Sequence, residues 1–326
     1  MADEFETIAR LLRPLAGAPE ALGLADDAAA IPARPDFDLV ISKDAMVAGV
    51  HFLPSDPLDL VARKLIRTNL SDLAAKGAEP YGYFLAIAWP PAAGWPEREA
   101  FAAGLGADQA AFGLTLLGGD TVSTPGPLTL SMTILGWTPS GGMVRRSGAR
   151  PGDRVLVSGT IGDGWLGLQA AKGELDGAVP AEAAAWLACR WRLPEPRLEL
   201  RDALRARAGA AADVSDGLIA DAGHVARASG VRLVLDLDRL PVSEPASLWL
   251  ARQPDHAAVL AALATGGDDY EIVLTAASDD VDPLIAEAEA AGVALTEIGT
   301  VADGEGVEVR LEGRVVEIAR AGWRHS

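Results

Sequence analysis

Aspartate side chains hold most of the chemistry that this sequence offers. The ones of interest stand in a loop, beside a glycine pair, at the edge of a predicted strand or helix, or inside an apolar helix. They are Asp26 and Asp27, Asp44, Asp72, Asp120, Asp213 and Asp216, and Asp268 and Asp269. Carboxylate oxygens without His or Cys companions are the ligands that Mg²⁺ selects, and Mg²⁺ commonly joins carboxylates to nucleotide phosphates. Together these aspartates indicate magnesium-dependent chemistry on a phosphate compound.

Asp72 falls on the apolar side of a helix predicted over residues 57–77. At about 100° per residue, that side carries Leu58, Val61, Ala62, Leu65, Asn69, Asp72 and Leu73, and the opposite side carries Arg63, Lys64, Arg67 and Ser71. An unpaired carboxylate is costly to bury, so we expect Asp72 to meet a cation, a set of donors or an open cleft. The alternative is an internally hydrogen-bonded aspartate with a structural role.

Asp44 ends a predicted strand that begins near Leu39. Because side chains alternate along a strand, Ser42 and Asp44 share a face and Lys43 points the other way. Ser42 and Asp44 can therefore present two oxygen ligands together. The alternative is an aspartate that closes the strand in a turn.

Asp120 follows a pair of glycines, Gly118 and Gly119. Glycine lets the backbone come close to a ligand and leaves amide groups free to bind an anion. The segment is a candidate phosphate contact, although Gly-Gly-Asp alone is a weak signal.

Asp213 and Asp216 flank Ser215 just before a helix predicted over residues 218–230. One of them could serve only as the N-cap of that helix. Two aspartates and a serine exceed what capping needs, and a helix N-terminus can also help to hold a phosphate-bound metal.

The elements that must position these residues form two α/β units. We expect strands at residues 39–41, 128–135 and 154–158, and helices at residues 57–77, 97–112, 198–209, 218–230 and 281–292. Turn-forming and basic residues are dense over 139–153. This pattern predicts an N-terminal domain over residues 1–138, a linker over 139–153 and a C-terminal α/β domain over 154–326.

Composition excludes several classes of protein. The 326 residues include 28 Lys plus Arg and 46 Asp plus Glu, and 28 − 46 = −18, so the chain should repel nucleic acid. The single Cys189 cannot form an internal disulfide, the four histidines have no zinc-site spacing, and no lysine follows a glycine as a Walker loop requires. The acidic start and the lack of a long uncharged stretch predict a cytoplasmic protein without membrane contact.

The glycine-rich turn over residues 159–164 has the order G-x-x-G-x-G, which differs from a dinucleotide fingerprint. We interpret it as a tight connection between a strand and a helix that needs positive φ.

Seven ordered motifs, spread over almost the whole chain, resemble the thiamine-monophosphate kinase family of the aminoimidazole ribonucleotide synthetase and selenophosphate synthetase superfamily. They are Asp26–Ala29, Ser42–Ala45 with Val47–Phe52, Asn69–Ala78, Gly118–Thr121, Arg146–Ala149, Asp213–Leu218 and Gly266–Glu271. The resemblance implies ATP-dependent phosphorylation of thiamine monophosphate to thiamine diphosphate, by direct in-line transfer with several Mg²⁺ ions. It also implies an α/β (α+β) two-domain fold, whose N-terminal ATP- and metal-binding domain forms a shared β-barrel in a homodimer.

The resemblance assigns site residues motif by motif. The metal ligands would be Asp27, Ser42, Asp44, Asp72, Asp120, Asp213 and Asp216. The ATP contacts would be Gly119, Asp120, Arg146 and Ser215, and the thiamine phosphate site would be lined by His51, Asp268 and Trp323. Without the resemblance, His51 and Trp323 could equally be packed side chains.

Two positions depart from the family pattern. Lys43 stands where the family usually has a hydroxyl residue and a metal ligand, so we expect ligation through its backbone carbonyl oxygen or none. Trp323 stands where the family often has Tyr or another aromatic residue, which preserves a flat face for the cationic thiazolium.

Two alternatives stay open from the sequence. One is a sister ATP-dependent synthetase of the same superfamily; a selenophosphate synthetase would need a Cys or selenocysteine near its N-terminus, whereas Cys189 lies far downstream. The other is a non-catalytic relative that binds a divalent metal or a nucleotide.

Overall fold

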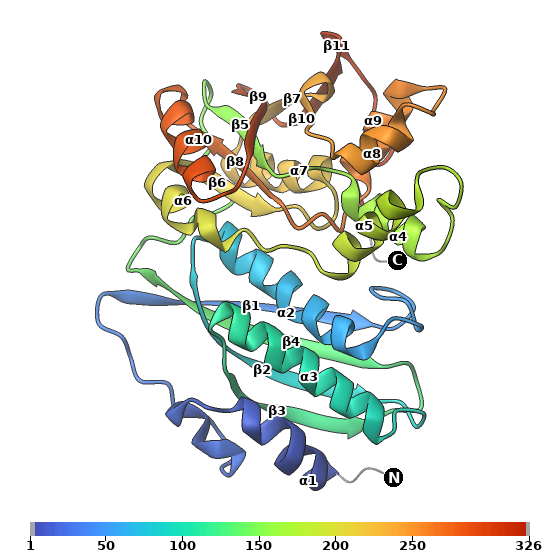
Figure 1. Ribbon diagram of the computed structural model, residues 1–326. Helices are drawn as coiled ribbons and strands as arrows, with labels where there is room; N and C mark the ends of the chain where they lie inside the picture. The colour runs from blue at the N-terminus through green and yellow to red at the C-terminus, as the bar shows by residue number, and fades with distance from the viewer. Residues whose placement is uncertain (1–3, 324–326) are drawn as a thin grey trace. The chain divides into compact units, whose positions relative to one another are not determined.

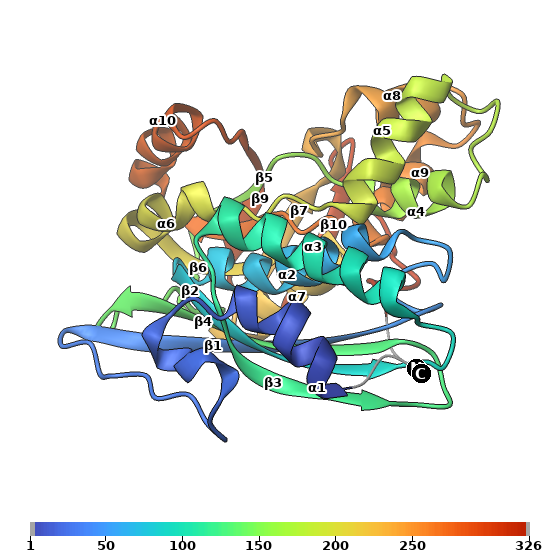
Figure 2. The ribbon, with the colours of Figure 1, turned by 60° about the horizontal axis from the view of Figure 1, so that its bottom comes forward.

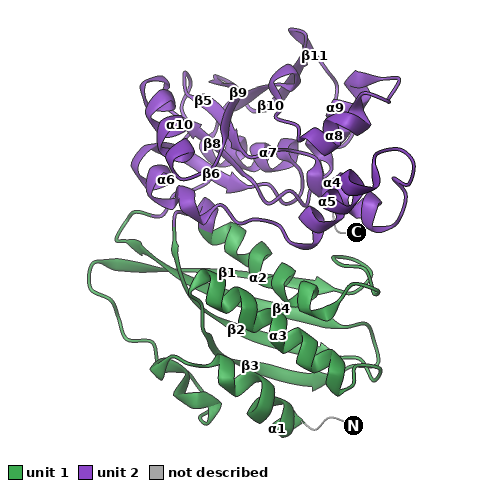
Figure 3. Cartoon of the chain, viewed as in Figure 1, with its two compact units in different colours: residues 1–73, 78–142 green, residues 74–77, 143–326 purple. Residues whose placement is uncertain are grey.

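The computed structural model describes residues 4–323 and divides into two compact units (Figures 1 and 3). Unit 1 comprises residues 1–73 and 78–142, and unit 2 comprises residues 74–77 and 143–326. The predicted domain boundaries remain predictions, because compactness alone does not show that either unit folds independently. Within residues 4–323, every helix is too short or too polar to cross a bilayer.

Unit 1 is built on a four-stranded mixed sheet. Its strands, in the order β1-β4-β2-β3, are β1 (Phe37–Val47), β4 (Thr129–Pro139), β2 (Glu79–Trp89) and β3 (Leu116–Ser123). β4 pairs antiparallel with both β1 and β2, whereas β2 and β3 run parallel. The strand predicted at residues 39–41 is thus eleven residues long, and Asp44 lies inside it rather than at its end. Pairing with β4 continues as far as Val47, which the local sequence could not indicate.

Two long helices of unit 1, α2 (Leu58–Ala75) and α3 (Trp95–Phe112), cover one face of this sheet (Figure 2). Arg63 and Arg67 of α2 both pair with Asp108 of α3, whose carboxylate is 1% exposed. Short helices precede the sheet: α1 (Glu4–Thr7), η1 (Ile8–Leu12), η2 (Arg13–Leu15) and η3 (Pro19–Leu24). The sheet therefore has one covered face and one open face.

Unit 2 contains a seven-stranded mixed sheet in the order β11-β10-β7-β9-β5-β8-β6. The strands are β5 (Arg154–Ser158), β6 (Ala208–Asp213), β7 (Arg232–Asp236), β8 (Ile272–Ala276), β9 (Leu295–Ala302), β10 (Gly306–Leu311) and β11 (Arg314–Val315). The helices are α4 (Asp163–Ala171), α5 (Ala181–Arg192), η4 (Leu198–Leu200), α6 (Arg201–Arg207), α7 (Leu218–Ser229), η5 (Leu237–Arg239), α8 (Glu244–Leu250), α9 (His256–Thr265), η6 (Ser278–Asp280) and α10 (Val281–Ala290).

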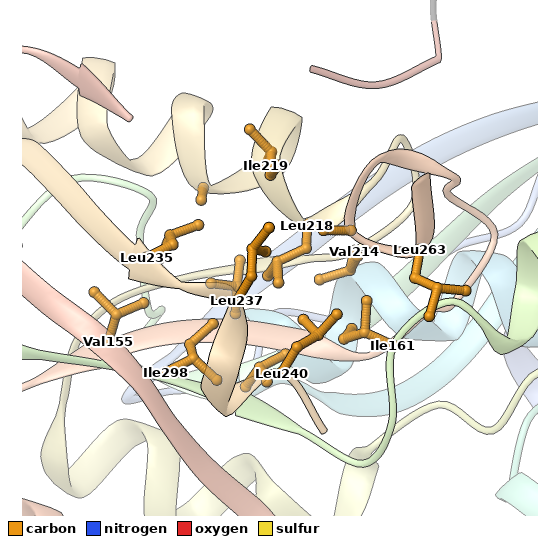
Figure 4. Close-up of a cluster of buried hydrophobic side chains, with 14 of the residues drawn as sticks. Val155, Ile161, Val214, Leu218, Ile219, Leu235, Leu237, Leu240, Leu263 and Ile298 are labelled. Atoms are coloured by element: carbon orange, nitrogen blue, oxygen red, sulfur yellow. The ribbon is translucent and has the colours of Figure 1, made fainter. Parts of the chain in front are cut away.

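A buried apolar cluster joins this sheet to α7 (Figure 4). Val155 and Ile298 come from β5 and β9, while Leu218 and Ile219 come from the first turn of α7. This packing fixes the start of α7 and with it the aspartates just before that helix. One expectation fails here: the helix predicted over 198–209 ends at Arg207, because Ala208 begins β6 and pairs with Ala276 of β8.

Candidate functional site

In unit 1 the structure brings Ser42, Asp44 and Asp72 together. Ser42 and Asp44 occupy alternate positions of β1 and face the covered side of the sheet, where Val40 and Met46 are buried. The hydroxyl of Ser42 donates to Oδ2 of Asp72 on α2, at 2.5 Å. Residues thirty positions apart in sequence therefore share one polar spot within an apolar layer.

Asp44 carries an electrostatic cost at this spot. Burial, and then the negative charge of Asp72, raise the pKa of Asp44 to about 6. A bound cation would offset both causes, because it stabilises ionised carboxylates. The donor set of one hydroxyl and two carboxylates fits a hard divalent ion.

Asp120 lies on the other face of the same sheet. β-Register places Gly119 opposite Leu85, which is buried on the covered face, and Asp120 opposite Ala86, which is exposed. Gly119 has φ +154°, and a Cβ there would collide with the carbonyl oxygen of Leu85. The pairing of β3 with β2 therefore itself requires glycine at position 119, which we considered from the sequence only as a point of approach to a ligand. Within one copy of unit 1, the sheet therefore lies between the side chains of Asp120 and Asp44.

Lys43 also points to the open face, and its Nζ donates to Ser131 Oγ at 2.7 Å. Its side chain is thus directed away from Asp44. This arrangement leaves only the backbone carbonyl of Lys43 for the ligation considered above.

Two other predicted residues of unit 1 lie outside the Ser42 spot. Asp27 is exposed on the segment between η3 and β1, and its backbone N–H donates to the carboxylate of Asp26 at 2.8 Å. His51 is half-buried, and its Nδ1 accepts from the backbone N–H of Val47 at 3.0 Å. That bond leaves Nε2 as the protonated nitrogen of a neutral His51 ring.

In unit 2 the segment from Asp213 to Gly217, named here the acidic turn, connects β6 to α7. The N-cap of α7 is Gly217, so neither Asp213 nor Asp216 caps the helix. The carbonyl oxygen of Ser215 accepts from the backbone N–H of Asp268, at 2.8 Å. The acidic turn is thereby bonded directly to a residue predicted for substrate binding.

Asp221 is a residue of this site that our sequence reasoning missed. It lies in the first turns of α7, and its Oδ2 accepts from the backbone N–H groups of Ser215 and Asp216. Burial, and then the charge of Asp216, raise the pKa of Asp221 to about 7. A signal was present: Asp221 falls in the apolar stripe of α7, as Asp72 does in α2.

Asp268 lies in a tightly bent loop between α9 and β8. The residue has φ +62°, and Tyr270 has φ +52°, both unusual for residues with side chains. Trp191 of α5 donates from Nε1 to Asp268 Oδ2 at 2.8 Å, and the Tyr270 hydroxyl donates to Oδ1 at 3.2 Å. Two donors therefore hold the Asp268 carboxylate in one orientation, at a backbone strained in the way functional loops often are.

The neighbouring residues anchor this loop in the core of unit 2. Asp269 is buried and accepts backbone N–H bonds from Gly162 and Gly164, so the glycine-rich turn holds a carboxylate of the chain itself. Burial raises the pKa of Asp269 well above its usual value. Glu271 is fully buried and pairs with Arg190 and Arg197. These contacts explain how the loop stays in its bent conformation.

Trp323 borders a groove in unit 2 with a volume of about 1490 Å³. The groove runs along α7 and is also lined by Asp216, His224 and Arg227. Trp323 is 52% exposed, and the guanidinium of Arg320 lies 5.7 Å from its ring centroid. An aromatic face and the acidic turn thus border one groove.

Arg146, predicted to bind ATP, is exposed and close enough to α7 to act on its charges. Burial, and then the positive charge of Arg146, lower the pKa of His224, and the same charge opposes the burial-driven rise of the Asp221 pKa. Within residues 4–323, Asp216, Asp221 and His224 also form a set with one ligand atom each inside 4.8 Å. The acidic turn is therefore flanked by both negative and positive side chains.

Two family models match the chain. The N-terminal domain of AIR synthase related proteins matches residues 25–138, and the C-terminal domain of the same proteins matches residues 150–312. Together they cover most of both units.

Known proteins resemble the chain over nearly its full length. A thiamine-monophosphate kinase of Caulobacter vibrioides is 57% identical over 99% of this chain and 90% of its own length. A crystal structure of a thiamine-monophosphate kinase from Stenotrophomonas maltophilia is 38% identical, with a TM-score of 0.81 over 93% of this chain and 94% of that one. The structure of AaThiL complexed with AMPPCP and TMP is 29% identical, with a TM-score of 0.79 over 92% of this chain and 91% of that one.

Proposed function

Because the chain belongs to the AIR synthase related family, and within it to the thiamine-monophosphate kinases, we propose that it uses ATP to phosphorylate thiamine monophosphate and releases thiamine diphosphate. The relative AaThiL, complexed with AMPPCP and TMP, supports this pair of substrates. The 57% identity to a thiamine-monophosphate kinase over almost the whole chain favours this enzyme over a sister synthetase or a non-catalytic relative.

The metal part of the proposal rests on the contact between Ser42 and Asp72, with Asp44 on the same face. These three side chains would bind one Mg²⁺ in unit 1. Asp27 and Asp120, which lie outside this spot, would belong to further Mg²⁺ sites, and Asp213 and Asp216 would bind Mg²⁺ in unit 2. When bound, Mg²⁺ neutralises phosphate charge that would otherwise keep ATP and thiamine monophosphate apart. Lys43 is left out as a side-chain ligand, because its side chain points away from Asp44 and its Nζ donates to Ser131.

We assign phosphate and nucleotide contacts to Gly119, Asp120, Arg146 and Ser215. Transfer would be direct and in line, from the γ-phosphate of ATP to a phosphate oxygen of the acceptor. That oxygen is already ionised near neutral pH, so no general base of the chain is required. The role of the chain is to orient the two substrates and to balance their charge.

The thiamine part would be bound by His51, Asp268 and Trp323. Asp268, oriented by Trp191 and Tyr270, offers a carboxylate to a cationic ring. Trp323 offers an exposed aromatic face, which attracts cations.

The homodimer is also part of the proposal, and its support is the open face of the unit 1 sheet. Ile41 of β1 and Val122 of β3 are 57% and 50% exposed on that face, at opposite edges of the sheet. A second copy would cover these apolar side chains. The oligomeric state, measured by light scattering for the wild type and for Ile41→Asp, tests this part; a monomeric wild type would contradict it. The cytoplasmic location stays a prediction.

A single assay tests the function. Purified protein is incubated with ATP, Mg²⁺ and thiamine monophosphate, and the thiamine species are separated by chromatography, with free thiamine and EDTA as controls. We expect thiamine diphosphate only with the monophosphate and the metal. A protein that binds ATP but forms no product would contradict the proposal and favour a sister synthetase or a non-catalytic relative.

A further inference from the structure

Asp221 holds the acidic turn from inside the helix that follows it. Its Oδ2 accepts from the backbone N–H groups of Ser215 and Asp216, each at 3.0 Å. The residue is 2% exposed, so water does not compete for these bonds. We propose that Asp221 is a positioning residue, which fixes the backbone of the turn so that Ser215 and Asp216 can bind ATP and metal. This inference rests on the function proposed above.

The turn needs such an acceptor because the N–H groups of Ser215 and Asp216 precede α7 and lie outside its ladder of backbone hydrogen bonds. Its N-cap, Gly217, has no side chain that could satisfy the free N–H groups at the start of the helix. Gly217 also adopts φ +119°, where a Cβ would approach the backbone of Thr265 to within 2.8 Å. Asp221 therefore does not cap the helix; from its first turns it accepts instead from the two backbone N–H groups that lie just in front of the N-cap.

The same two turn residues are bonded on their carbonyl side as well. Ser215 O accepts from the N–H of Asp268, and Asp216 O accepts from the N–H of Trp323, both at 2.8 Å. Asp268 and Trp323 are the residues assigned to thiamine phosphate in unit 2. A shift of the turn after loss of Asp221 would therefore disturb both the ATP and metal residues and the backbone of the substrate residues.

A competing explanation makes Asp221 itself a metal ligand, since Asp216, Asp221 and His224 lie close together. The two roles make opposite predictions for Asp221→Asn. Both N–H groups bond to the same oxygen, Oδ2, and an amide oxygen can accept both. The Asn variant therefore preserves the positioning role, whereas a ligand that loses its charge would lose metal affinity.

The first measurement is hydrogen exchange of the Ser215 and Asp216 amides in the metal-free full chain. The comparison includes the wild type, Asp221→Ala, Asp221→Asn and Asp255→Ala. Asp255 is the matched control: its Oδ1 also accepts a backbone N–H, that of Ala258 at the start of α9. We expect both turn amides to exchange at least about tenfold faster in Asp221→Ala, and to stay within about threefold of wild type in the other two variants.

The second measurement is calorimetric titration with AMPPCP at fixed Mg²⁺, and then with Mg²⁺ at fixed AMPPCP. Loss of a group that orients metal ligands typically weakens metal affinity about 10- to 100-fold. We expect a weakening of that size for Asp221→Ala, and values within about threefold of wild type for Asp221→Asn and Asp255→Ala.

Wild-type exchange or wild-type affinity in Asp221→Ala overturns the inference, as does Asp221→Asn with affinity as weak as the Ala variant. If Asp221→Ala does not fold, Asp221→Asn decides: retained protection and affinity support positioning, and loss of either refutes it. A wild type that does not bind AMPPCP with Mg²⁺ refutes the proposed function. Normal wild-type binding with an unaffected Asp221→Ala refutes only the positioning role.

Discussion

The hydroxyl of Ser42 on β1 lies 2.5 Å from Oδ2 of Asp72 on α2 and donates a hydrogen bond to it. This bond ties the central helix of unit 1 to the strand that also carries Asp44. Because Asp44 shares the face of Ser42, three oxygen-bearing side chains from two elements meet in one place. The carboxylates of Asp44 and Asp72 carry the negative charge that would hold Mg²⁺ at this place, and catalysis should depend on that charge.

Asp44→Asn and Asp72→Asn should each reduce thiamine diphosphate formation at least about 100-fold, because an amide binds Mg²⁺ much more weakly than a carboxylate. The fold should persist, since an amide keeps the shape and an acceptor oxygen. Chromatographic rate measurements and thermal unfolding check both parts. Asp38→Asn, on the same strand and exposed, is the control and should keep the wild-type rate. Near-normal turnover of the Asp44 or Asp72 variant would refute the metal assignment.

Gly119→Ala should destabilise unit 1 by about 2 kcal/mol or more, because a Cβ would collide with the Leu85 backbone at φ +154°. Gly118→Ala is the matched control: its Cβ would lie 3.1 Å from the Phe84 ring, a side chain that can shift. Chemical denaturation measures both free energies of unfolding. Equal stability of the two variants would show that the pairing of β2 and β3 tolerates a side chain at position 119.

Asp163 predicts a specific pH dependence of stability. Burial raises its pKa, despite hydrogen bonds from Ser243 and Thr160 that lower it. The folded protein therefore keeps a proton on Asp163 at pH values, from about 4 upward, at which the unfolded chain has already released it. Between the pKa of the unfolded chain and the higher pKa of the folded state, Asp163 makes the free energy of unfolding fall as pH rises. The free energy of unfolding of Asp163→Asn, measured by denaturation from pH 4 to 8, should lack this contribution. The difference, wild type minus variant, should decrease with pH and then level off; a constant difference would refute the assignment.

Trp323→Ala should raise the KM for thiamine monophosphate about tenfold, with a smaller change in kcat, because it removes the aromatic face for the cationic ring. Trp323→Phe should stay within about threefold of wild type. Trp186→Ala is the control, since Trp186 is 44% exposed on α5 and assigned to no site. Steady-state kinetics over a range of thiamine monophosphate concentrations measures both constants. An unchanged KM in Trp323→Ala would remove Trp323 from the substrate site.

The sequence by itself determined which elements carry the key residues and, for several of them, which face. Helical spacing placed Asp72 in the apolar stripe of α2. Strand alternation placed Ser42 and Asp44 on one face of β1 and Lys43 on the opposite face. These inferences held because they depend on periodicity within one element, where neighbouring residues set the geometry. The same arithmetic would have identified Asp221 in α7.

Only the tertiary structure decided what meets across the chain. Ser42 and Asp72 are thirty residues apart, and Asp269 accepts from Gly162 over 107 residues, so their contacts depend on how strands and helices pack. Strand register decided that Asp120 faces away from Asp44 and that β1 extends past Asp44 to Val47. A shift of one residue in either ladder would move every side chain to the other face, and no local pattern fixes that register. Long-range pairing, rather than composition or spacing, therefore determined the geometry of the site.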